Sequence, residues 1–123
     1  MTPFGDRMRK LRSERGVTLK QMAEGLGVSS AYLSALEHGK RGRPGWHLIQ
    51  RILAYFNIIW DEADEVVRLA RISHPRITID TSGLTPKATE LANRLADDIG
   101  KLDPATLDEI VAILGRKRSK PRG

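Results

Sequence analysis

Residues 28–44, VSSAYLSALEHGKRGRP, place hydroxyl-bearing and basic side chains close together in the sequence. The segment begins without charge, and its outward positions are small or polar. Behind it come His38, Lys40, Arg41 and Arg43. Hydroxyl groups both donate and accept hydrogen bonds, while Lys and Arg neutralise phosphate groups. The pattern suits a surface that binds an anion with a short helix and the loop after it.

Charge is unevenly distributed along the chain. Residues 1–60 hold ten Lys and Arg against four Asp and Glu, residues 61–115 hold six against eleven, and residues 116–123 hold five against none. This asymmetry indicates a polyanion-binding N-terminal domain joined to a segment with another task. Charge alone fits an ordinary solvated surface equally well, so the motifs must decide.

Length and composition exclude several classes of protein. A chain of 123 residues is the size of one domain, or of one small domain with an appendage. It has no cysteine, which excludes disulfides and thiolate zinc sites and favours the reducing cytoplasm. No apolar run approaches the roughly 20 residues of a membrane span, and the N-terminus MTPFGDRMRK lacks an apolar signal core. We expect a soluble, cytoplasmic protein without a membrane partner.

The sequence contains no pattern typical of catalysis or metal binding. His38, His47 and His74 lack both ligand spacing and acidic neighbours. The carboxylates of DEADE, residues 61–65, fit the solvated first turn of a helix, where the helix dipole favours negative charge. We therefore predict no enzyme, no catalytic residue, no metal site and no cofactor.

Helical periodicity dominates the first 72 residues. Apolar residues recur at helical spacing, and the breaks between them carry capping residues, glycines or proline. The pattern predicts five short helices in one bundle, with Trp46 and Trp60 in its core. The expected helices begin near residue 3, at Thr18, at Ser29, after Pro44 and at Asp61 or a close neighbour.

The residue pattern changes after residue 72. The stretch SHPRITIDTSGLTP, residues 73–86, holds two prolines, a glycine and the alternating Ile77 and Ile79, so residues 73–84 read as a linker containing at most a short strand. Residues 85–115 read as a helical hairpin, and residues 116–123 as a basic disordered tail. Two helices with one apolar stripe each need a further surface to bury both stripes. The hairpin must therefore pack on the N-terminal bundle or on another chain, and we predict that it dimerises.

The glycine at position 27 lies in a helix-turn-helix. TLKQMAEGLGVSSAYLSALEHGKRGRP, together with MRKLRSERGV before it and WHLIQRILAYFNI after it, resembles the lambda-repressor/Cro-like (Xre family) regulators of bacteria and phages. The resemblance covers roughly residues 4–70. It implies an all-α fold, a five-helix lambda-repressor-like DNA-binding bundle over residues 1–72, followed here by the C-terminal two-helix hairpin.

The resemblance also assigns roles to single residues. It implies a recognition helix over residues 29–38 that lies in the major groove of DNA. Thr18 and Ser29 would meet phosphates at helix N-termini, and His38 would cap a helix end or touch a phosphate. Tyr32 either contacts DNA or lies over the bundle. The surface that would face DNA is Ser29, Ser30, Ala31, Tyr32, Ser34 and Ala35; the phosphate loop is Lys40, Arg41 and Arg43; the structural ion pair is Arg12 and Glu37.

Two departures from the family pattern affect how DNA would be read. The family often begins its second helix with a glutamine that clamps DNA, and Leu19 stands there instead. The recognition face also lacks Arg, Gln and Asn, which make bidentate contacts to bases. We expect DNA shape, bridging water and contacts outside the helix to carry much of the specificity.

Two functions from different classes remain. The first is a sequence-specific transcriptional regulator, a repressor, that binds double-stranded DNA as a homodimer on a palindromic operator and is nucleoid-associated when bound. The alternative is an antitoxin or protein-interaction module that binds a partner through its C-terminal hairpin. The first is favoured because residues 73–115 look folded, whereas toxin-wrapping segments are commonly disordered until bound. The sequence leaves any small-molecule effector open.

Overall fold

The computed structural model describes residues 1–119, and every regular element in that range is helical. The chain divides into two units, Met1–Ile77 and the part from Thr78 onward. The elements are α1 (Pro3–Arg15), α2 (Leu19–Leu26), α3 (Ser30–Glu37), α4 (Trp46–Tyr55), α5 (Trp60–Arg71), α6 (Pro86–Asp98), the 3₁₀ turn η1 (Ile99–Lys101) and α7 (Pro104–Ser119). The predicted all-α class with five helices in the N-terminal bundle is confirmed.

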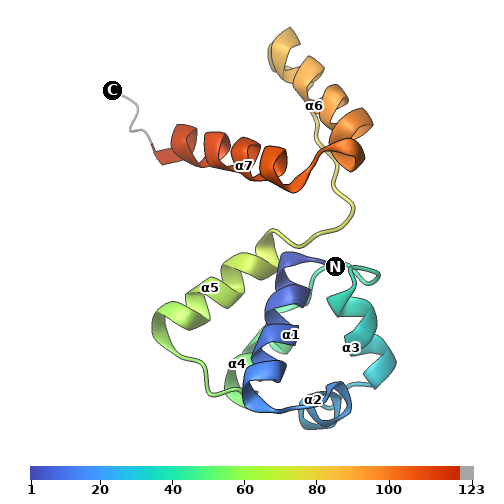
Figure 1. The fold of residues 1–123 in the computed structure, drawn as a ribbon, viewed down its shortest axis with the longest axis vertical. Coiled ribbons are helices and arrows are strands. Elements are labelled where there is room, and N and C mark those ends of the chain that lie inside the picture. The colour runs from blue at the N-terminus through green and yellow to red at the C-terminus, as the bar shows by residue number, and fades with distance from the viewer. Residues whose placement is uncertain (120–123) are drawn as a thin grey trace. The chain divides into compact units, whose positions relative to one another are not determined.

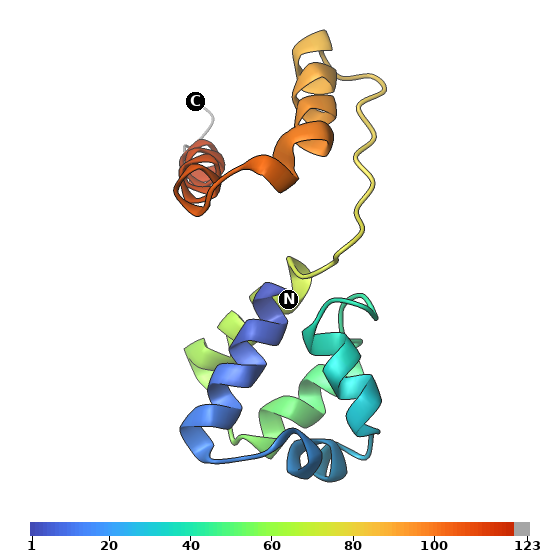
Figure 2. The same cartoon turned by 45° about the vertical axis from the view of Figure 1, so that its right-hand side comes forward.

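The first unit is a bundle in which α1 to α5 surround one apolar core (Figure 1 and Figure 2). Each helix contributes residues from one face, as their helical spacing predicts. The fully packed core consists of Phe4, Met8, Leu11, Met22, Ala23, Leu26, Leu33, Leu36, Ile49, Ile52, Phe56, Ile58, Val66 and Ala70.

Local sequence explains where α2 ends and α3 begins. The N-cap Thr18 and the third helical residue, Gln21, form a reciprocal capping box at the start of α2. Gly27 ends α2 in the left-handed region, with a φ of 74°, which other residues adopt only at a cost. The backbone N–H of Gly27 donates to the carbonyl oxygens of Ala23 and Glu24 in the last turn of α2. This glycine turn brings α3 out at the angle of a helix-turn-helix.

The two tryptophans are not core residues, and this prediction was wrong. Trp46 is 62% exposed and Trp60 is 82% exposed. Each is the first residue of its helix, and the core positions on α4 and α5 are taken by Ile49, Ile52 and Val66. A residue in the first turn of a helix can project beyond the end of the core even when its side chain is large and apolar.

The second unit contains α6, η1 and α7, and no residue of α6 is buried. The axes of α6 and α7 diverge from the turn at η1, so the two helices do not pack along their lengths (Figure 1 and Figure 2). Apolar side chains stay exposed on both, including Leu91 on α6 and Leu114 on α7. The apolar residues of the predicted stripes are therefore at least partly exposed within this unit.

One boundary of this unit differs from the prediction. The helix α7 continues past Gly115 to Ser119 and so enters the segment 116–123 that the sequence assigned to a disordered tail. Residues 120–123 of that segment lie outside the described residues. No strand is present between α5 and α6 in the described chain, and Ile77 and Ile79 are exposed. Their pairing with a second copy stays a prediction.

Candidate nucleic-acid interface

The helix α3 presents a small, polar face to solvent. Its N-cap Ser29 accepts a hydrogen bond from the backbone N–H of Tyr32 at 3.0 Å, which fixes the first turn. Ser29, Ser30 and Ala31 are exposed, while Tyr32, Ser34 and Ala35 are half-buried. The inward positions are Leu33 and Leu36. All six residues predicted to face DNA therefore lie wholly or partly on the surface.

The two predicted N-terminal phosphate contacts are both capping residues. The Thr18 hydroxyl oxygen accepts the N–H of Gln21 at 3.0 Å, and Ser29 caps α3 in the same way. The hydroxyl hydrogens stay available as donors, because capping uses only the oxygen lone pairs. Leu19, at the place of the family's glutamine, is half-buried against the core and offers no polar group.

A cation–π contact joins the recognition helix to the basic loop. The guanidinium carbon of Arg41 lies 5.8 Å from the centroid of the Tyr32 ring. One part of Tyr32 packs against the core, while its ring supports the charge from the loop. The two interpretations of Tyr32, packing and contact with a ligand, are therefore compatible, and Arg41 is held beside α3.

His38 bonds to its own helix. Its Nδ1 lies 2.8 Å from the carbonyl oxygen of Ser34. A carbonyl oxygen can only accept, so Nδ1 carries the hydrogen. In the neutral imidazole the other nitrogen, Nε2, then has no hydrogen to give to a phosphate. This geometry fits the capping role at the end of α3 better than a phosphate contact.

The loop after α3 carries positive charge that the described chain does not neutralise. Lys40, Arg41 and Arg43 are exposed, and none of them forms an ion pair with a described acidic residue. The loop turns at Gly39 and Gly42, both with a φ of 77°. Three uncompensated charges on a tight loop beside α3 form a surface suited to phosphates.

Sequence reasoning missed two residues next to this loop. Arg43 lines a shallow cavity of about 300 Å³ together with Trp46 and Arg71. Arg71 is exposed and has no ion-pair partner in the described chain. Trp46 follows the basic loop closely, which was a usable signal. Arg71 lies at the end of α5, and only the fold brings it near Arg43.

A buried ion pair fixes α3 against α1. Arg12 donates two hydrogen bonds to Glu37, from Nε at 3.2 Å and from Nη2 at 2.9 Å, and Glu37 is 2% exposed. The two helices also approach closely, since a Cβ on Gly5 would lie 2.0 Å from the Glu37 carbonyl oxygen. Only glycine fits there. The expected pair is thus present and sets the orientation of the recognition helix.

Other kinds of site are not visible in the part of the chain that the structure describes. No group of His, Asp and Glu residues there could hold a metal ion. Within the same residues, no helix is both long and apolar enough to cross a membrane.

Comparisons with known proteins agree with this geometry. A family model described as a helix-turn-helix domain matches residues 3–66. The uncharacterized HTH-type transcriptional regulator RghRB and the HTH-type transcriptional repressor RghR, both of Bacillus subtilis, are each 39% identical over 61 residues. Those matches cover 50% of this chain and 44% and 45% of the two relatives.

Further matches concern proteins named SinR. The HTH-type transcriptional regulator SinR of Bacillus licheniformis is 29% identical over 66 residues, which is 50% of this chain and 60% of that protein. A solved complex of SinR and SinI proteins is similar over 95% of this chain and 99% of that one, at 19% identity and a TM-score of 0.45. These relatives are named as transcriptional regulators and not as enzymes, in agreement with the prediction that this chain is not an enzyme.

The family model covers more than half of the chain, and the five helices follow the predicted order with the glycine turn between α2 and α3. The chain therefore belongs to the helix-turn-helix domain family, in its lambda-repressor/Cro-like (Xre) form.

Proposed function

We propose that the protein is a transcriptional repressor that binds double-stranded DNA sequence-specifically, as a homodimer on a palindromic operator in the cytoplasm. The observation that supports this most directly is the exposed face of α3 beside a loop of three uncompensated positive charges. Membership of the helix-turn-helix family also supports binding to DNA. The curated relatives are matched over only about half of their length, so their activities enter here as support for a proposal.

In this proposal the two parts of the surface have different tasks. The recognition helix α3 enters the major groove, where Ser30, Ala31 and Tyr32 meet base edges. The loop follows the phosphate backbone and contributes affinity with little sequence information. Trp46 and Arg71 extend this phosphate-binding surface on the far side of Arg43. Binding that rests mostly on backbone contacts suits a recognition face without Arg, Gln or Asn.

The proposed dimerisation is supported by exposed apolar residues in the second unit. Recognition helices must lie roughly 34 Å apart to enter successive major grooves, so a second copy has to be held in place. Apolar residues of α6 and α7 stay exposed within the second unit. Pairing of two such units across a twofold axis would bury them. The same uncovered residues also fit an unrelated protein, which is the alternative of an antitoxin or interaction module.

A truncated chain of residues 1–77 tests the dimer. Every residue of the buried core lies within this range, so the truncated chain should fold. We expect it to sediment as a monomer in analytical ultracentrifugation and to lose most of its operator affinity, while the full chain sediments as a dimer. A dimeric truncated chain would move the interface into the first unit. A monomeric full chain that copurifies with one unrelated protein would favour the alternative.

A further inference from the structure

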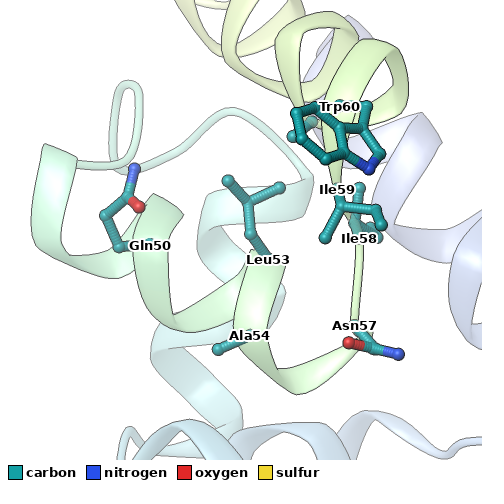
Figure 3. A pocket seen from close by; sticks show the side chains of 8 residues that line it. Gln50, Leu53, Ala54, Asn57, Ile58, Ile59 and Trp60 are labelled. Carbon is teal, nitrogen blue, oxygen red and sulfur yellow. The ribbon is translucent and has the colours of Figure 1, made fainter.

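An apolar groove lies at the end of α4 that is farther from the basic loop. One wall comes from Gln50, Leu53 and Ala54 of α4, and the other from residues 57–60 (Figure 3). Its volume is about 470 Å³. Ile59 is 62% exposed and Trp60 is 82% exposed, and they are neighbours in the chain. Adjacent exposed apolar residues of this size are typical of an interaction site.

The backbone of this groove is strained. Asn57 has a φ of 54° and Trp60 a φ of 56°, and among the residues that the structure describes these are the two non-glycine residues with positive φ. Asparagine tolerates this region, but a bulky residue such as tryptophan is a clear outlier in it. Such conformations cost about 1–3 kcal/mol each and cluster at functional sites. A glycine at position 60 would adopt this φ without strain.

The first turn of α5, which begins at Trp60, carries uncompensated negative charge. Asp61 follows Trp60 directly, and Asp64 lies one helical turn after it on the same face of α5. Both are exposed, and neither forms an ion pair with a described basic residue. Their neighbours differ, because Glu62 pairs with Arg7 and Glu65 pairs with Arg68. The negative charge next to the indole is therefore free to meet a cation.

The position of the groove leaves it open when DNA is bound as proposed. The basic loop precedes the first residue of α4, whereas the groove lies at the other end of that helix, about 15 Å away along its axis. No residue of α3 or of the loop lines the groove. An occupant of this groove and DNA would thus use different ends of α4.

We propose that this groove is a docking site for an amphipathic segment of another protein, one that carries Lys or Arg beside its apolar residues. The apolar side chains of the segment cover Leu53, Ile59 and Trp60. A Lys or Arg of the segment lies over the exposed indole and meets Asp61 and Asp64, so that cation–π and ionic attraction act together. Charge complementarity selects this occupant over a second copy of the same patch, which would bring like charges together.

Fluorescence of Trp60 in the full chain tests the proposal. The chain has two tryptophans, and Trp46→Phe leaves Trp60 as the only one. The probe is a synthetic helical peptide built only from Leu and Lys, and its control is the same peptide with Glu in place of Lys. We expect the Leu–Lys peptide to shift Trp60 emission to shorter wavelength in a saturable way, and the Leu–Glu peptide to have no effect.

Substitutions at Asp61, Asp64 and Trp60 test whether the peptide binds at the groove. Replacing both aspartates, Asp61→Asn and Asp64→Asn, should weaken the Leu–Lys peptide roughly fivefold to tenfold, because two exposed ionic contacts are lost. The matched control, Asp97→Asn with Asp98→Asn in the second unit, should bind as before. Trp60→Gly removes the indole and places at position 60 a residue that adopts the local φ without strain. We therefore expect this variant to fold. Binding of labelled peptide to this variant should fall to the level of the Leu–Glu peptide.

Three results would overturn the proposal. The first is equal binding of the two peptides, and the second is unchanged peptide binding in Trp60→Gly. The third is a shift of Trp60 emission when the concentration of the chain alone is raised, since that result assigns the groove to a second copy.

Discussion

The side chains of Lys40, Arg41 and Arg43 differ in how they are held, although all three carry charge toward solvent. Arg41 lies over the Tyr32 ring, and Arg43 lies beside Trp46 at the shallow cavity. Lys40 has neither support. A residue held in place before binding loses less conformational entropy on contact with a phosphate. Of the three, the arginines are therefore better prepared for a fixed contact.

Replacing these three residues with Ala tests the phosphate loop. Affinity should fall by a similar factor for cognate and unrelated DNA, and the salt slope should become shallower by up to about 0.9 for each lost contact. Fluorescence anisotropy of labelled duplexes at several salt concentrations measures both quantities. Lys87→Ala with Arg94→Ala, which removes the two cations paired with Glu90, is the control. A loss confined to the cognate sequence would assign the loop to base reading.

At the scale of elements, the start of α7 depends on one carboxylate. Asp103 accepts a hydrogen bond from the backbone N–H of Thr106 at 2.8 Å, and Pro104 begins the helix. Hydrogen bonds from the Thr106 side chain and then from its backbone N–H lower the pKa of Asp103 below its ordinary value. The ionised carboxylate is thus the form that caps the helix.

The pH dependence of this cap has a definite sign. Because the pKa of Asp103 is lowered in the folded state, the stabilisation is complete above the ordinary aspartate pKa of about 3.9 and is lost as the pH falls through the lowered value. Asp103→Asn keeps a capping oxygen that does not titrate. Circular dichroism of both chains over acidic pH should show a loss of helix in the natural chain that is smaller in the variant. Identical acid transitions would contradict the role of Asp103.

Helices were predictable from the sequence because capping residues and apolar spacing are local signals. Thr18, Gly27 and Ser29 occupy the caps that their types predict. The error on Trp46 and Trp60 has a different origin. Hydrophobicity predicts burial, but whether the first turn of a helix reaches the core depends on how the neighbouring helices end, which is a property of the whole bundle.

The candidate site was predictable to the same extent. The face of α3 and the loop follow from a continuous stretch of sequence, so their exposure could be anticipated. Arg71 could not, because it comes from α5 and meets Arg43 only in the folded bundle. The contact of Arg41 with Tyr32 likewise depends on the path of the loop between Gly39 and Gly42.

At the scale of the whole molecule, we expect the first unit to be more stable than the second. All residues of the buried core belong to the first unit, and α6 has no buried residue. Isolated helices of this length are marginal in water, so α6 and α7 need association to persist. The first unit does not share this dependence.

Dilution of the full chain should therefore melt the second unit before the first. As the chain falls below the dissociation constant of the dimer, the helical signal should decrease by a part that the truncated chain of residues 1–77 never shows. Circular dichroism at 222 nm over a range of concentrations measures this, with sedimentation giving the dissociation constant. A helical signal that stays constant through dissociation would show that α6 and α7 are stable alone.

The segment that joins the two units has a consequence for which DNA sites the proposed dimer accepts. Ser73 is bonded to Phe4 in the first unit and Thr81 to Thr89 in the second, so the residues between them, 74–80, span up to about 25 Å when extended. With the second units paired, each DNA-binding unit is a tethered ligand: occupation of one half-site raises the local concentration of the other unit over a range of distances. Half-site spacing would then be set by the helical repeat of DNA. Operators whose half-sites are separated by an additional full turn, or arranged as direct repeats, should retain much of the avidity that a rigid dimer would lose.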